Sequence, residues 1–199
     1  MADYPGFIAI ETGEDDGLPL AIAWSLPDGR VKQTLIQPDD SWIKEDTNAM
    51  GAYSIEELES LGVSPLEVIR ELENDHFSAT LYTSDNGDDE AALARLFDTY
   101  GLDPFVELAP ASVLYPSITP SEWHRQRRET FSELGLEPMR PEHELEVMLS
   151  MHHRLGHRRS TLRQRALQPH PAFGRRSTAA RAHACSANMC QQRGLGGGS

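Results

Sequence analysis

The sequence predicts an α/β fold in which helices flank a mixed sheet whose first strands are antiparallel. Three strand-like segments separated by turn sequences open the chain, and two further strand-like segments then alternate with helical patterns. Hydrophobic residues make up 39% of the 199 residues, which is enough to form the core of one ordinary domain. The expected order of elements is β-β-β-α-α-β-α-β-α-α.

The first three strands are expected over residues 5–11, 20–25 and 31–38. The first contains FIAIETG, which is apolar until Glu11 and then enters the turn sequence GEDDGLP. LAIAWS forms the second strand, and LPDGR after it is typical of a hairpin turn. VKQTLIQP has the alternation of a third strand. We therefore expect an antiparallel meander at the start of the sheet.

Helix-start patterns dominate the next part of the chain. Ser54, followed by Glu57, forms a capping box for a short helix that ends at Gly62. Ser64 and Pro65 begin a second helix, because a hydroxyl cap followed by proline is a typical first turn. The remaining expected elements are the strand FSATLYTS, the helix DDEAALARLFDTYG, the strand FVEL, and the helices SEWHRQRRETFSELG and PEHELEVMLSMHHR.

Charge divides the chain into two parts. All 31 acidic residues but only nine of the 18 basic ones lie in the first 150 positions, so that part carries −22 and residues 151–199 carry +9. Apolar periodicity ends near residue 155, and Arg, Ala, His, Pro, Gly and Ser dominate the rest of the chain. We therefore predict a folded domain over residues 1–155 and a disordered, low-complexity basic tail over residues 156–199.

The basic tail has two explanations. An acid-free sequence rich in Arg, Ala, His and Pro is typical of a GC-rich coding sequence translated in a shifted reading frame. The alternative is a genuine arm that binds nucleic acid. We favour out-of-frame sequence, because the tail has no Lys and lacks the interleaved aromatic residues of such arms.

The sequence shows none of the patterns that are typical of membrane-spanning or secreted proteins. No apolar run approaches the ~18 residues that a membrane helix needs. The N-terminal MADYPGF lacks the basic and apolar regions of a signal peptide, so we expect a cytoplasmic protein without a membrane partner. Cys185 and Cys190 lack the pairing pattern of a zinc site, and we interpret them as free thiols.

The order of the motifs resembles the ribonuclease H-like DEDD 3′-5′ exonucleases, and among them the His-containing, DnaQ-like (DEDDh) branch. FIAIETG resembles the first motif, Asp-x-Glu-Thr-x-Gly, at the end of a hydrophobic strand. LYTSDNGDDEAALARLF resembles the second motif, with Asp89 as its aspartate. MHHRLGHRRS resembles the third motif, with His153 at the position of its histidine. The resemblance covers residues 5–155 and implies that the domain over residues 1–155 is exonuclease-like, with a ribonuclease H-like fold.

This resemblance implies a metal-dependent hydrolase that acts on single-stranded nucleic-acid 3′ ends. Two Mg²⁺ ions, or Mn²⁺, would activate water and stabilise the leaving oxygen, held by carboxylates. Glu11 and Asp89 would be metal ligands, and His153 would be the general base.

Two of the four expected carboxylates are missing from this chain. Ala9 stands two residues before Glu11, where the first motif has aspartate, and Arg158 stands five residues after His153, where the third motif has aspartate. In a strand, residues two apart share a face, so position 9 would lie beside Glu11. We therefore predict an impaired exonuclease-like protein, and the alternative is a catalytically inactive ribonuclease H-like fold that acts as a binding or scaffold module.

Overall fold

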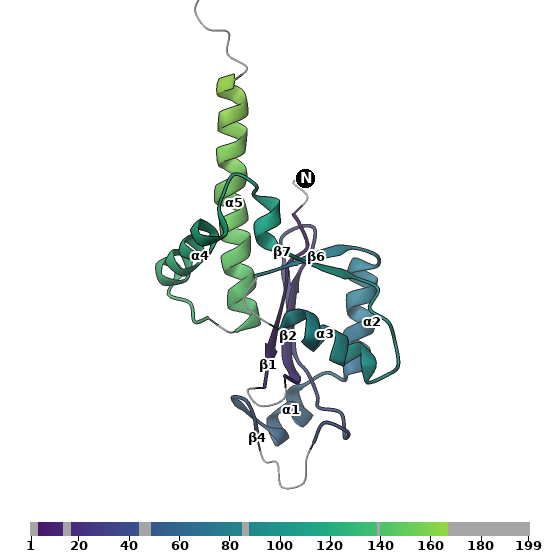
Figure 1. Cartoon of the computed structure of the whole chain (residues 1–199). Helices are drawn as coiled ribbons and strands as arrows, with labels where there is room; N and C mark the ends of the chain where they lie inside the picture. The colour runs from purple at the N-terminus through teal and green to yellow at the C-terminus, as the bar shows by residue number, and fades with distance from the viewer. Residues whose placement is uncertain (1–3, 14–16, 44–48, 85–87, 139, 167–199) are drawn as a thin grey trace, which may run out of the picture.

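The computed structural model describes residues 4–13, 17–43, 49–84, 88–138 and 140–166, with side chains up to residue 156. Within these ranges a sheet lies between two groups of helices (Figure 1). In Figure 1, α4 (Pro120–Leu134) and α5 (Pro141–Ala166) lie to the left of the sheet, and α2 (Pro65–His76) and α3 (Asp89–Asp98) lie to its right. None of the described helices is long and apolar enough to span a bilayer.

The first half of the sheet is the predicted antiparallel meander. It consists of β1 (Ile8–Thr12), β2 (Pro19–Ser25) and β3 (Val31–Leu35), with β2 in the centre. The register places Ala9 opposite Ala23. Every residue of β2 is buried, because helices cover both faces of the sheet at this position.

The second half of the sheet is parallel. β6 (Thr80–Thr83) pairs with β7 (Glu107–Pro110), and an isolated parallel bridge between Phe7 and Tyr82 brings β6 beside β1. The Tyr82 N–H donates to the Gly6 carbonyl at 2.8 Å across this junction. The strand order is therefore β3-β2-β1-β6-β7, which confirms the predicted mixed sheet.

Local capping explains where the helices begin. Ser54 and Glu57 form the predicted capping box at α1 (Ile55–Leu61), and the Ser64 side chain accepts from the Glu67 N–H at α2. Thr119 caps α4 in the same way. The structure also contains a hairpin of β4 (Ala49–Met50) and β5 (Tyr53–Ser54) and a 3₁₀ turn, η1 (Ala111–Leu114), which the sequence did not predict.

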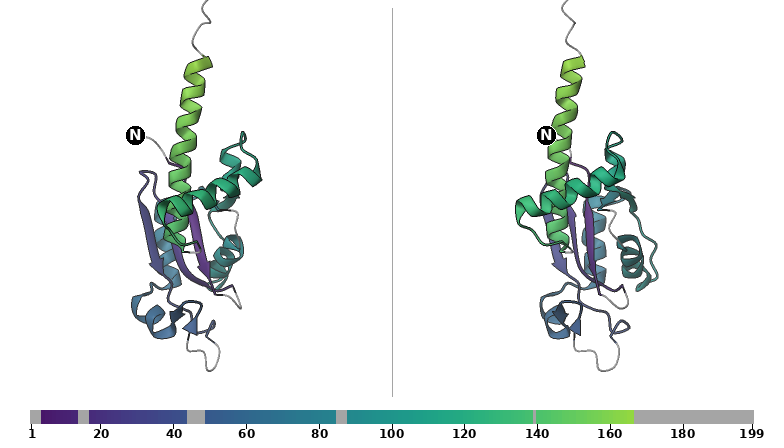
Figure 2. Two further views of the ribbon diagram at one scale, coloured as in Figure 1. Left: turned by 90° about the vertical axis from the view of Figure 1, so that its left-hand side faces the viewer. Right: turned by 60° about the vertical axis from the view of Figure 1, so that its left-hand side comes forward.

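Alternating residues of β1 belong to two different apolar clusters. Ile8 belongs to the cluster on the α2 and α3 side, whereas Phe7 and Ala9 belong to the cluster on the α4 and α5 side. Because side chains alternate along a strand, Glu11 shares the α4 and α5 side with Ala9. Figure 2 shows α4 and α5 crossing in front of the sheet on this face.

α5 is longer than predicted. Its apolar pattern ends at the buried Leu155, but the helical backbone continues to Ala166 and projects past the sheet (Figure 1). Residues 157–166 contain four Arg and one each of Gln, Leu and Ala, residue types that favour helix. The helix therefore crosses the expected boundary at residue 155, and residues 167–199 of the predicted tail lie outside the described part of the chain.

Candidate functional site

Glu11 lies near the end of β1 and is partly buried. The Tyr53 hydroxyl, from the short β5, donates to Glu11 Oε2 at 3.0 Å. Burial raises the pKa of Glu11, and the hydrogen bond from Tyr53 and the charge of Arg140 offset part of this effect. Burial and the adjacent Glu11 raise the pKa of Tyr53 to about 12, so Tyr53 remains a hydrogen-bond donor at neutral pH.

Asp89 is the first residue of α3, and its side chain turns toward β1. Asp89 is 9% exposed, and its Oδ1 accepts a hydrogen bond from the Ile10 N–H at 2.9 Å. Burial raises the pKa of Asp89 to about 6, although the hydrogen bond from Ile10 lowers it and the negative charge of Glu144 raises it further. The structure therefore brings Asp89 to the residue that precedes Glu11 in β1.

A buried ion pair joins α4 and α5. Arg127 of α4 donates from Nε to Glu144 Oε2 at 3.1 Å and from Nη2 to Glu144 Oε1. The two side chains are 7% and 8% exposed, so both charges are removed from water. Both charges act on Asp89, because Glu144 raises its pKa and Arg127 lowers it.

Position 9 is apolar and closed. Ala9 is 4% exposed and belongs to a cluster that includes Trp123 from α4 and Met148 from α5. It shares the strand face of Glu11, as predicted, but the space around it is filled by hydrophobic side chains rather than by polar groups. The lost carboxylate of the first motif is therefore not replaced by a neighbouring acid at this position among the described residues.

His153 lies on α5, well past the turn that carries Glu144. It follows Glu144 by nine residues on α5, which is about 13 Å along a helix. The adjacent His152 forms a 2.7 Å hydrogen bond between its Nδ1 and the Tyr115 hydroxyl and contacts the ring of Phe7. The general-base role of His153 stays a prediction from the motif resemblance, and the side chain of Arg158 lies outside the described part.

The sequence interpretation missed Tyr53, Arg127 and Glu144. Arg127 could have been found, because Trp123, Arg127 and Phe131 recur at intervals of four on the buried face of α4. Tyr53 and Glu144 had no comparable pattern, since each reaches the site through the packing of its element. Across the described residues, no group of three or more His, Cys, Asp and Glu side chains is placed to hold a metal ion.

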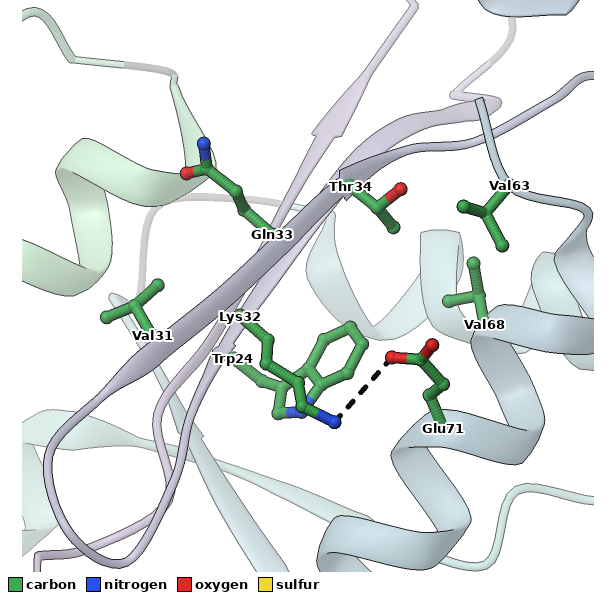
Figure 3. Close-up of a pocket in the computed structure, with 8 residues that line it drawn as sticks. All are labelled: Trp24, Val31, Lys32, Gln33, Thr34, Val63, Val68 and Glu71. Carbon is green, nitrogen blue, oxygen red and sulfur yellow. Dashed lines mark ion pairs between the residues drawn. The ribbon is translucent and has the colours of Figure 1, made fainter. Parts of the chain in front are cut away.

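Cavities among the described residues include two at the sheet. One of about 430 Å³ is lined by residues that include Tyr53, Arg140 and Glu142, and Tyr53 also donates to Glu11. The other, of about 490 Å³, lies between β3 and α2 (Figure 3). In Figure 3, Lys32 crosses the face of Trp24 and pairs with Glu71 at 3.6 Å. The second cavity contains none of the predicted site residues.

Comparisons with known proteins find similarity in structure only. No protein-family model matches the chain, and no curated protein matches it. E. coli ExoI, in a zinc-bound complex with ssDNA, superposes with a TM-score of 0.55 at 14% identity over 80% of this chain and 42% of ExoI.

The Mopeia virus exonuclease domain matches with lower scores. The form partially complexed with manganese gives a TM-score of 0.39 at 20% identity over 67% of this chain and 62% of that domain. The form soaked with alendronate gives a TM-score of 0.40 at 18% identity, over 68% of this chain and 60% of that domain. This chain thus spans under half of ExoI and about three-fifths of the viral domain. The strand order and the similarity to ExoI show that the chain has the ribonuclease H-like α/β fold of exonucleases.

Proposed function

We propose that this chain is a 3′-5′ exonuclease-like protein that binds 3′ ends of single-stranded nucleic acid and whose metal-dependent hydrolysis is impaired. The observation that carries the proposal is that Asp89 of α3 accepts from the backbone N–H of Ile10, the residue before Glu11 in β1. A cavity of about 430 Å³, lined in part by Tyr53, has the size of a small-ligand site. ExoI, which shares the fold, is seen in complex with ssDNA, and this supports the substrate class.

The residues at the end of β1 do not fit a catalytic metal pair. Mg²⁺ takes roughly six oxygen ligands, and two-metal sites depend on several carboxylates to offset the charge of both ions. Here Ala9 supplies no oxygen, and both oxygens of Glu144 already accept hydrogen bonds from Arg127. Glu11 and Asp89 alone would hold Mg²⁺ weakly, so impaired hydrolysis follows from this composition.

The second candidate is a catalytically inactive module that binds a partner or serves as a scaffold. The apolar packing of Ala9 favours it, because a buried alanine among hydrophobic side chains stabilises the fold without any bound ion. The division into a domain over residues 1–155 and a tail over residues 156–199 applies to both candidates and remains a proposal.

A labelled single strand separates the two candidates. Anisotropy with a 5′-labelled DNA or RNA strand would measure binding, and gel electrophoresis of the same 5′-labelled strand with Mg²⁺ or Mn²⁺ would measure trimming. We expect binding with slow trimming, and Glu11→Ala and Asp89→Ala should each abolish the trimming. Glu90→Ala is the matched control, because Glu90 is the exposed neighbour of Asp89.

Each result of this experiment identifies one candidate. Binding without trimming in the wild type would make the chain an inactive nucleic-acid-binding module. Absence of both binding and trimming would reject the exonuclease-like proposal and leave the scaffold candidate.

A further inference from the structure

The guanidinium group of Arg127 lies in the interior of the domain. Arg127 is 5% exposed, and its guanidinium carbon lies 4.9 Å from the ring centroid of Phe131. Trp123, one turn earlier on α4, is also buried in the same apolar cluster. A cation in such surroundings needs a charged partner, because the loss of water is costly. Glu144 is that partner and accepts from two of the Arg127 N–H groups.

The pair also controls the charge next to Asp89. Without Arg127, Asp89 and Glu144 would be two buried carboxylates of like charge, which repel each other. Arg127 attracts both. Its planar N–H groups match the two oxygens of Glu144, and a divalent ion would have to displace them to reach those oxygens.

We propose that Arg127 is a built-in cation that takes the place of a divalent metal ion, occupying both oxygens of the buried Glu144 and so weakening metal binding at this site. This inference deepens the proposed function, because it names the group that impairs metal-dependent hydrolysis. It does not depend on nucleic-acid binding. Its test measures metal binding and thermal stability, so it can fail or succeed separately from the strand-binding experiment.

The wild-type protein provides the first test. Mn²⁺ titration followed by electron paramagnetic resonance would count bound ions, and melting curves would be compared in chelator and in millimolar Mn²⁺. We expect no saturable binding below about 1 mM and no shift in Tm, because a ligand that does not bind the folded state cannot stabilise it. Saturable binding by the wild type, or a clear rise in Tm, would overturn the proposal.

Substitution of Arg127 provides the second test. Arg127→Met removes this cation from Glu144 and Asp89, so Tm in chelator should fall and Mn²⁺ should restore several degrees of it. Arg127→Lys keeps a positive charge and should respond to Mn²⁺ no more than the wild type. Arg125→Met is the matched control, because Arg125 makes exposed ion pairs on the same helix.

A double substitution provides a reference in case the single variant misfolds. Arg127→Met with Glu144→Leu removes both buried charges, and such replacements are commonly tolerated. The double variant should fold and show no Mn²⁺ response. If Arg127→Met gains no more Tm in Mn²⁺ than this double variant, the cation does not substitute for metal and the proposal is wrong. If Arg127→Met does not fold in either condition, the wild-type Mn²⁺ titration decides.

Discussion

The burial of Asp89 predicts that replacing it with asparagine stabilises the metal-free protein. The pKa of Asp89 rises from the reference value 3.8 to about 6, chiefly because its carboxylate is removed from water. A difference of about two pKa units corresponds to about 3 kcal/mol between the two protonation states. The ionised form of Asp89 therefore lowers the free energy of unfolding at pH 7 by up to this amount.

The sign of the pH dependence follows from proton binding. The folded protein binds the Asp89 proton more tightly than the unfolded chain, so the contribution is fully present below the unfolded pKa of 3.8 and is lost as pH rises through about 6. Asp89→Asn removes the charge and keeps an oxygen that can accept from the Ile10 N–H. The variant should gain up to about 3 kcal/mol at pH 7 and almost nothing below pH 4.

Urea unfolding in chelator between pH 4 and pH 7.5 measures this difference. Asp88→Asn is the matched control, because Asp88 precedes Asp89 but is exposed and its side chain makes no capping hydrogen bond. The control should change the free energy of unfolding by less than about 0.5 kcal/mol. If Asp89→Asn is no more stable than the wild type at pH 7, or gains equally at pH 4, then burial does not control the ionisation of Asp89.

Three further predictions test the packing around the sheet. Ala9→Asp should lower the free energy of unfolding in chelator by about 3 kcal/mol or more, measured in urea, because it buries an unpaired charge in an apolar cluster; an unchanged urea midpoint would contradict the packing. Burial lowers the pKa of His76 below its usual 6.5. The stability that neutral His76 contributes is therefore present above pH 6.5 and lost as pH falls through its folded pKa. Calorimetry of His76→Gln should accordingly show a Tm that depends less on pH than the wild-type Tm does. Gly62→Ala should lower Tm, because the added Cβ would lie 2.3 and 2.6 Å from backbone atoms. Gly156→Ala should raise Tm, because Gly156 lies in open space on α5 and alanine favours helix. Equal shifts in Tm for the two variants would reject the steric explanation.

Local sequence rules explain most of the secondary structure. The Ser54 capping box and the Ser64-Pro65 start depend on residues within one turn, and both occur where predicted. Gly62 does end α1, but its φ of −76° shows that the glycine is needed for a close backbone approach rather than for a left-handed conformation. The β4–β5 hairpin was missed because each of its strands has only two residues, too few for any periodicity.

The candidate site was predictable only in part. Glu11 and Asp89 were singled out from the order of the motifs. In the structure Asp89 accepts from the Ile10 N–H, one residue before Glu11, and the metal-ligand roles of both stay predictions. His153 was assigned by similarity to a short motif in a long helix. A shift along such a helix moves a residue about 1.5 Å per position, so only the packing of α5 against β1 determines which of its residues face the site.

The sequence by itself determined that position 9 has no carboxylate and that Ala9 and Glu11 share one strand face, because strand periodicity is a local property. The tertiary structure alone decided which groups surround that face. Asp89 accepts from the Ile10 N–H although the two residues are 79 positions apart in the sequence. Arg127 pairs with Glu144, which lies 17 positions away. Such pairs depend on how whole helices pack against the sheet, and burial then makes the charges interact strongly because little water remains to screen them.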